Sequence, residues 1–204
     1  VVDTAGVVKR KIDYSTTKDG QQLKPFMPSD KSQIVFIGDD LYIPQTVNLR
    51  LGDKAIERSP IKVVLDTIEN TSEALPMRFP PLINYKDFGT VGAFGAEYSF
   101  CYDGNRFIYS FDADEDLYLT TSAHEKVEKK KAKSKYIDNV TVFRSTEGNF
   151  QKMVRAQCEH ASYGKILYDK YRDVYYRFVY PPCDTSDYFG DYVELPVSYT
   201  HLTL

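Results

Sequence analysis

Residues 163–180, YGKILYDKYRDVYYRFVY, constrain the fold of this chain more than any other stretch, because they join two apolar runs through a short charged segment. The runs cover residues 166–168 and 174–180, and residues 169–173 lie between them. Branched and aromatic residues favour a pleated sheet, and an Asp-containing connection favours a turn. The pattern predicts a β-hairpin. The second run carries apolar or aromatic groups on both faces, so we expect other parts of the protein to cover it on both sides.

Composition extends this prediction to the whole chain. The 204 residues are 42% hydrophobic and 27% charged, which is typical of a globular protein, and they include 17 Tyr and 12 Phe but no Trp. Aromatic richness without helical periodicity favours a mostly β fold. A net charge of −3 argues against a nucleic-acid binder, because such proteins usually carry a basic excess. Small molecules, glycans or proteins are the expected partners.

Further strands are predicted upstream of the hairpin. A tight hairpin is expected at residues 33–43, where Gly38, Asp39 and Asp40 form the turn. Four consecutive antiparallel strands are expected between the hairpin at residues 33–43 and the hairpin at residues 163–180. Four strands match the size of one blade of a β-propeller. These four strands are predicted at residues 96–102, 105–111, 117–121 and 127–133. We therefore predict a mostly β, antiparallel, partial β-propeller-like fragment.

One amphipathic helix is predicted near residues 147–162. Residues three and four positions apart share one face of a helix. The mainly apolar stripe on this face consists of Phe150, Met153, Val154, Gln157, Cys158 and Ala161.

Three regions are expected along the chain. Residues 1–32 form an irregular N-terminal remnant, residues 33–196 form an incomplete propeller-like β domain, and residues 197–204 form a tail. The tail, VSYTHLTL, resembles the in-frame translation of a sequencing adaptor. We therefore expect the natural chain to end near Leu195 or Pro196, and we exclude His201 from any site. A polar terminal strand is the alternative interpretation.

Cysteine spacing and acidic spacing argue against a metal site or cofactor. Cys101, Cys158 and Cys183 match neither a disulfide framework nor a zinc knuckle, so three buried thiols are expected. Residues 112–116 carry three aspartates in the alternating pattern of a calcium loop. Leu117 and Ala123 then occupy the positions where an EF-hand needs glycine and glutamate, which leaves a solvated turn or an irregular calcium site.

Catalytic motifs are missing from the sequence. There is no GxSxG elbow and no Cys/His signature of a known nucleophile. The carboxylates of Glu97, Asp116, Asp169 and Asp173 are placed at predicted strand ends, where propeller loops can build a hydrolase site. Solvated turn residues are the simpler interpretation, so the catalytic residues stay unknown.

The hairpin supplies the candidate binding residues. Tyrosine rings can stack on sugars or apolar groups when they face solvent. The candidates are Tyr168, Tyr171, Arg172, Asp173 and Tyr175. The alternative is that the rings pack in a blade core while Arg172 and Asp173 pair locally to fix the turn.

Two segments carry a family resemblance. Residues 132–140, AKSKYIDNV, and the hairpin at residues 163–180 resemble a bacterial envelope family known as domain of unknown function 4221. The resemblance implies an exported, often lipid-anchored protein with a β-propeller-like fold and no assigned activity. It therefore implies location in the cell envelope, in the periplasm or at the outer membrane. Contact with a membrane is expected only through a lipid anchor upstream of this chain.

The expected function is non-enzymatic binding of a glycan or an envelope protein. A glycan-active hydrolase or lyase, with carboxylates at the propeller mouth, is the alternative. A second alternative is a purely structural fragment that holds no site.

Overall fold

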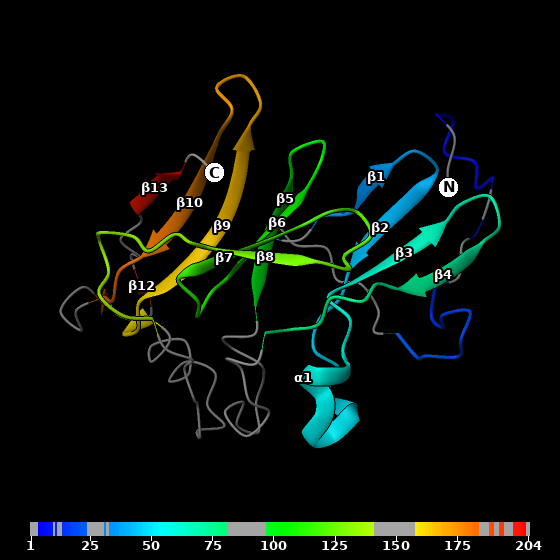
Figure 1. Cartoon of the computed structure of the whole chain (residues 1–204), viewed down its shortest axis with the longest axis horizontal. Helices are drawn as coiled ribbons and strands as arrows, with labels where there is room; N and C mark the ends of the chain where they lie inside the picture. The colour runs from blue at the N-terminus through cyan, green and yellow to red at the C-terminus, as the bar shows by residue number, and fades with distance from the viewer. Residues whose placement is uncertain are drawn as a thin grey trace.

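The computed structural model describes residues 4–9, 11, 14–23, 31, 33–80, 97–140, 158–183, 188–189, 192–193 and 198–202. This part of the protein is mostly β, its strands pair antiparallel, and it contains almost no helix. Three larger sheets follow one another across Figure 1 in chain order. The described strands form open sheets and close no barrel. The predicted mostly antiparallel β fold is confirmed.

The first sheet is a four-stranded meander. It contains β1 (Val35–Ile37), β2 (Asp40–Pro44), β3 (Lys62–Asp66) and β4 (Thr71–Ala74) in that order. Gly38 has a φ of 60° in the β1–β2 turn, a conformation that glycine adopts without strain. The predicted hairpin at residues 33–43 is therefore present.

A short helical segment connects β2 to β3. It consists of the 3₁₀ turn η1 (Leu49–Lys54) and the single α-helical turn α1 (Ala55–Arg58), seen below the first sheet in Figure 1. Ala55 and Ile56 are buried in this segment and anchor it to the core.

The second sheet is another four-stranded meander, and it confirms the four strands predicted between residues 96 and 133. It contains β5 (Tyr98–Tyr102), β6 (Phe107–Phe111), β7 (Asp116–Thr120) and β8 (Val127–Lys131). The β5–β6 turn forms as expected. The Asp103 carboxylate accepts hydrogen bonds from the backbone N–H groups of Asn105 and Arg106.

Gly104 provides a test of this turn, because its φ is 103° and an added Cβ would have no heavy atom within 4 Å. Any destabilisation of Gly104→Ala therefore reports backbone strain alone. We expect the substitution to lower the free energy of unfolding by about 1–2 kcal/mol in urea titration. Asn105→Ala, at the exposed neighbouring position, is the control and should change little. Equal effects of the two substitutions would contradict the argument.

The third sheet has the order β13-β10-β9 and contains the predicted hairpin. Its strands are β9 (Ser162–Asp169), β10 (Val174–Tyr180) and β13 (Ser198–Leu202). Residues 198–202 of the tail thus pair with β10, and backbone pairing of this kind needs no particular side chains. A small two-stranded hairpin, β11 (Tyr188–Phe189) and β12 (Tyr192–Val193), completes the described strands.

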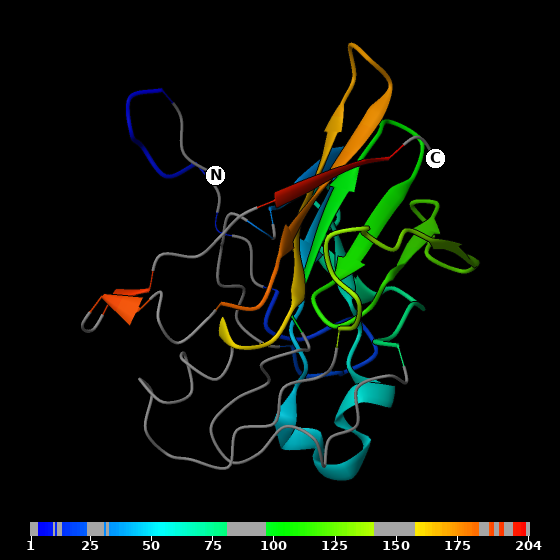
Figure 2. The ribbon, with the colours of Figure 1, turned by 90° about the vertical axis from the view of Figure 1, so that its left-hand side faces the viewer.

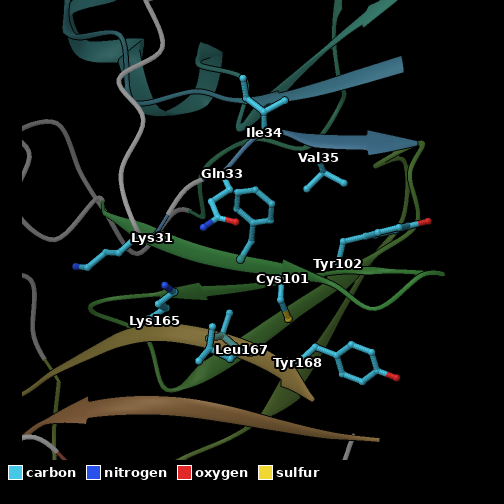
Figure 3. A pocket seen from close by; sticks show the side chains of 11 residues that line it. Lys31, Gln33, Ile34, Val35, Cys101, Tyr102, Lys165, Leu167 and Tyr168 are labelled. Carbon is cyan, nitrogen blue, oxygen red and sulfur yellow. The ribbon is translucent and has the colours of Figure 1, made fainter. Parts of the chain in front are cut away.

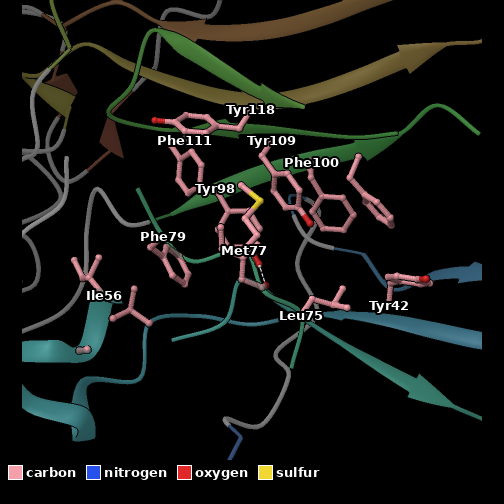
Figure 4. Close-up of a cluster of buried hydrophobic side chains, with 14 residues drawn as sticks. Tyr42, Ile56, Leu75, Met77, Phe79, Tyr98, Phe100, Tyr109, Phe111 and Tyr118 are labelled. Carbon is pink, nitrogen blue, oxygen red and sulfur yellow. Dashed lines mark hydrogen bonds between the residues drawn. The ribbon is translucent and has the colours of Figure 1, made fainter. Parts of the chain in front are cut away.

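The sheets stack through two main core clusters, and strand β6 contributes to both. Its alternating side chains point to opposite faces. Phe107, Tyr109 and Phe111 pack with the first sheet, whereas Ile108 packs with Ile166 of the third sheet. Figure 4 shows the first cluster, in which rings of β5 and β6 meet side chains of the first sheet and α1. Figure 2 shows the third sheet beside the second sheet, where β9 contacts β5 and β6.

Two-sided burial occurs in β6, whereas the sequence suggested it for β10. Every residue of β6 is buried. In β10 the buried residues Tyr175, Arg177 and Val179 alternate with half-buried Tyr176 and Phe178. The reason is position, because β6 belongs to the middle sheet and β10 belongs to the last sheet of the described stack.

Several predictions concern features that the described residues do not test. Residues 147–157 of the predicted amphipathic helix lie outside the described residues; at its end Cys158 is helical, whereas residues 159–161 are not. The division into residues 1–32, 33–196 and 197–204 stays a prediction, as does the origin of the tail. In the described part of the chain, no helix has the length and hydropathy needed to cross a membrane.

Candidate functional site

A pocket of about 380 Å³ opens where the first strands of the three sheets meet. Strands β1, β5 and β9 are each the edge strand of their sheet, and β5 lies against β9. The pocket lies along these edges, with the segment that leads into β1 on one side and β9 on the other (Figure 3). It is lined by Lys31, Gln33, Ile34, Val35, Phe100, Cys101, Tyr102, Lys165, Ile166, Leu167 and Tyr168.

The lining has a cationic end and an aromatic end. Figure 3 shows Lys31 and Lys165 at one end and the rings of Tyr102 and Tyr168 at the other. The Tyr102 hydroxyl donates to the carbonyl oxygen of Gly104 at 2.8 Å, and the Tyr168 hydroxyl donates to Asp173 at 3.0 Å. Both hydroxyls are therefore held in place by the protein, which orients the rings.

Lys31 connects the pocket to two carboxylates. Its Nζ lies 3.1 Å from Glu97 Oε2 and 3.0 Å from Asp112 Oδ2. Burial acts to lower the pKa of Lys31, but the charges of Asp112 and Glu97 outweigh it and raise this pKa. Lys31 therefore stays protonated.

Asp112 is the buried member of this cluster. Burial raises its pKa to about 7, although the charge of Lys31 opposes the change. Its Oδ1 atom has no hydrogen-bond partner among the described residues. A carboxyl group with a pKa near 7 can hold or release a proton at neutral pH.

Cys101 lines the pocket but is a poor nucleophile. Burial, together with the nearby charge of Asp103, raises the pKa of its thiol to about 12. The thiolate is the reactive form of cysteine, so Cys101 stays in its unreactive form at neutral pH.

The predicted binding residues separate into three environments. Only Tyr168 lines the pocket. Tyr175 is 3% exposed, its ring centroid lies 5.0 Å from that of Tyr168, and its hydroxyl donates to Asp103 at 2.7 Å. Tyr171 is 87% exposed at the hairpin tip. Arg172 pairs with Asp169 of its own turn at 2.7 Å, while Asp173 has a φ of 54° and ends the turn.

The remaining sequence candidates lie elsewhere. Asp114 accepts hydrogen bonds from the Asp116 backbone and the Tyr118 hydroxyl, so the residues of the calcium-like pattern are used locally. No group of three or more His, Cys, Asp or Glu side chains within the described ranges is arranged to hold a metal. Of the predicted strand-end carboxylates, Glu97 contacts the pocket residue Lys31, and Asp173 accepts a hydrogen bond from the pocket residue Tyr168.

A second buried polar cluster lies between the first and second sheets, where His124 packs beside Tyr42 and Tyr109. His124 Nδ1 lies 2.9 Å from the carbonyl oxygen of Ser122, so this nitrogen carries the proton and donates. Its Nε2 then accepts from the Tyr109 hydroxyl at 2.6 Å. Burial lowers the pKa of His124 to about 4, which keeps the ring neutral. With both ring nitrogens occupied, His124 has a structural role.

The sequence did not reveal most of the pocket. Lys31 and Gln33 precede a short strand and carry no motif, and Lys165 occupies one alternate position of β9. The signal that could have found them is topological, because the first strands of successive meanders lie at the same edge of the stack.

Comparisons with known proteins agree with this architecture. The family model described as Domain of unknown function (DUF4221) matches residues 1–193. A crystal structure of a DUF4221 family member from Bacteroides vulgatus superposes with a TM-score of 0.78 at 20% sequence identity. The match covers 99% of this chain and 57% of that chain, so this chain spans little more than half of that protein. No curated protein matches. The chain described here belongs to the DUF4221 family.

Proposed function

We propose that this chain is part of a non-enzymatic glycan-binding protein, and that the glycan binds in the pocket along β1, β5 and β9. The observation that carries the proposal is the composition of the pocket wall. Tyrosine rings lie at one end, amide and ammonium donors lie at the other, and none of the described lining residues carries a carboxylate.

The chemistry of the wall suits a sugar. Pockets of about 300–1,000 Å³ suit small ligands, and the volume of about 380 Å³ lies in this range. The ring faces of Tyr102 and Tyr168 offer stacking surfaces for the C–H groups of a sugar. Gln33 and Lys165 supply hydrogen-bond donors for its hydroxyl or carboxylate groups.

We also propose that the sheets are blades of an incomplete β-propeller. Two four-stranded meanders follow each other and a third sheet begins, as expected for successive blades. The pocket then lies on the channel side, where first strands converge. The solved family member is longer than this chain, which is consistent with further blades.

Location in the bacterial cell envelope is part of the proposal. It rests on the family resemblance described above, which implies export and a lipid anchor. Fractionation of cells that express the full open reading frame, with and without a lipid-labelling probe, tests it. Recovery of unlabelled protein with the cytoplasm would refute this part.

A glycan-active hydrolase or lyase is the second candidate, supported by one observation. Glu97 and Asp112 contact the same ammonium group of Lys31, and the pKa of Asp112 is about 7. Incubation of the full-length protein with glycans distinguishes the two candidates. New reducing ends or unsaturated products would favour the enzyme.

The ligand is first identified by screening the full-length protein on a glycan panel. The binding proposal then predicts that substitutions in the pocket weaken binding of that glycan. Tyr168→Ala and Lys165→Ala should each raise Kd roughly five- to tenfold in calorimetry, because each removes one pocket contact. Tyr171→Ala at the exposed hairpin tip is the matched control and should bind as the unmodified protein does. Thermal unfolding confirms that each variant folds. Unchanged affinity in both pocket variants, or no glycan bound at all, would contradict the proposal and favour a purely structural role.

A further inference from the structure

Two cysteines that are distant in the sequence lie next to each other at the open end of the β9–β10 hairpin. Cys158 precedes β9, and Cys183 follows β10. The backbone N–H of Cys183 donates to the carbonyl oxygen of Cys158 at 2.8 Å. The antiparallel pairing of the hairpin, which extends to Tyr180 and Ser162, brings the two residues together.

We propose that Cys158 and Cys183 are a disulfide-forming pair, which closes the open end of the hairpin covalently when the protein meets an oxidant. Neither cysteine takes part in a disulfide in the structure. The proposal is independent of the glycan-binding function, because Cys101 is the only cysteine that lines the pocket.

The backbone geometry permits the bond. Cys158 and Cys183 lie beyond the paired strands, and the 2.8 Å hydrogen bond between their backbones limits the separation of their Cα atoms to about 6.7 Å at most. A disulfide spans Cα separations of about 4.4–6.8 Å. The two sulfur atoms also influence each other electrostatically, since burial and then the neighbouring Cys183 raise the pKa of Cys158.

The accessibility of the two thiols suggests an order of events. Cys158 is half-buried, whereas Cys183 is 7% exposed. The Cys158 thiolate attacks a small disulfide oxidant such as oxidised glutathione and displaces one glutathione thiolate. The Cys183 thiolate then attacks the Cys158 sulfur and displaces the second. The protein loses two protons and two electrons, and the oxidant becomes two thiols.

The bond would add a covalent link to the backbone hydrogen bond that joins Cys158 and Cys183. Ala161, Tyr163 and Val179 pack in a small separate cluster beside this end of the hairpin. A covalent link beside that cluster restricts opening of the hairpin from its free end.

The test exposes folded protein to oxidised glutathione at pH 8 and counts the thiols after denaturation. We expect the count to fall from three to one, with an intact mass lower by two hydrogens. Non-reducing peptide mapping should link Cys158 to Cys183. The thermal midpoint should rise, and reductant should reverse the change.

Serine variants provide the controls. Cys158→Ser and Cys183→Ser should each keep their remaining protein thiols free of any intramolecular bond, whereas Cys101→Ser should still form the disulfide. Three reactive thiols after oxidation, a stable glutathione adduct on Cys158, or a link to Cys101 would each overturn the proposal.

Discussion

Replacement of Arg177 by methionine is expected to lower the free energy of unfolding by about 3–5 kcal/mol, a loss typical of breaking a buried charged network. Arg177 is fully buried in the middle of β10. Its guanidinium donates to Ser110 Oγ at 2.8 Å and to the carbonyl oxygen of Glu115 at 2.9 Å. Its other acceptors are the carbonyl oxygens of Phe111, Asp114 and Ala132.

These contacts explain the size of the effect. The acceptors lie at the end of β6, in the β6–β7 turn and just after β8, so one side chain joins the third sheet to the second. The guanidinium also lies 3.4 Å from the ring centroid of Tyr163. Burial lowers the pKa of Arg177 to about 10, so it is still charged at neutral pH. Methionine fills similar space but leaves the acceptors buried and unsatisfied.

Urea denaturation followed by circular dichroism measures this loss. Arg172→Met in the same hairpin is the matched control, because Arg172 is exposed and pairs with Asp169 of its own turn. Its substitution should change stability very little. Arg177→Lys should restore only part of the loss, because an ammonium cannot reproduce the planar fork. Equal midpoints for the Arg177→Met and Arg172→Met variants would refute the bridging role.

Replacement of Lys62 by methionine is expected to have the opposite effect, an increase of several kcal/mol near pH 7. Lys62 is fully buried, and its Nζ lies 3.3 Å from the ring centroid of Phe100. No hydrogen-bond acceptor for this nitrogen exists among the described residues. Ring faces attract a cation, but burial without an anion dominates and lowers the pKa of Lys62 well below 10.5.

The same substitution should remove a pH dependence. Between the lowered folded pKa of Lys62 and its unfolded value of 10.5, the unfolded chain binds a proton that the folded chain does not. The free energy of unfolding therefore rises with pH in this window, by up to about 1.4 kcal/mol per pH unit. The difference between the original protein and Lys62→Met should consequently shrink from pH 6 to pH 9.

Urea titrations at several pH values measure this difference. Lys129→Met is the matched control, since Lys129 also lies over an aromatic ring, with its Nζ 4.8 Å from the ring centroid of Tyr118, but on the exposed strand β8. It should leave the pH dependence unchanged. A gap between the original protein and Lys62→Met that stays constant with pH would mean that Lys62 keeps its charge in the folded state.

Local patterns in the sequence were sufficient for the strands. The Asp103-Gly104 turn and the alternating residues around it predicted β5 and β6, because turn chemistry and strand periodicity depend on residues that are close in the chain. The same reasoning placed the turn before Val174. It could not identify the partners of Arg177 or Lys62, because those partners come from other sheets.

The candidate site illustrates the same division. Tyr168 was predicted as a binding residue and lines the pocket, whereas Tyr175, one of the same set, is buried and bonded to Asp103. Both are tyrosines at strand positions of one hairpin. They are direct cross-strand partners on the same face of the third sheet, and their roles differ because β9 is the edge strand beside the pocket whereas β10 lies inside the sheet. A single strand carries no information about its place in a sheet.

By itself, the sequence determined that this chain forms antiparallel strands, where its turns lie and to which family it is similar, because these properties depend on short-range periodicity and motif. Only the tertiary structure decided which strand is covered on both faces, which charges are buried, and that Lys31, Lys165 and Tyr168 share one pocket. The physical reason is that stacking of sheets brings together residues far apart in the chain. The burial of each residue, and with it its chemistry, is set by those neighbours.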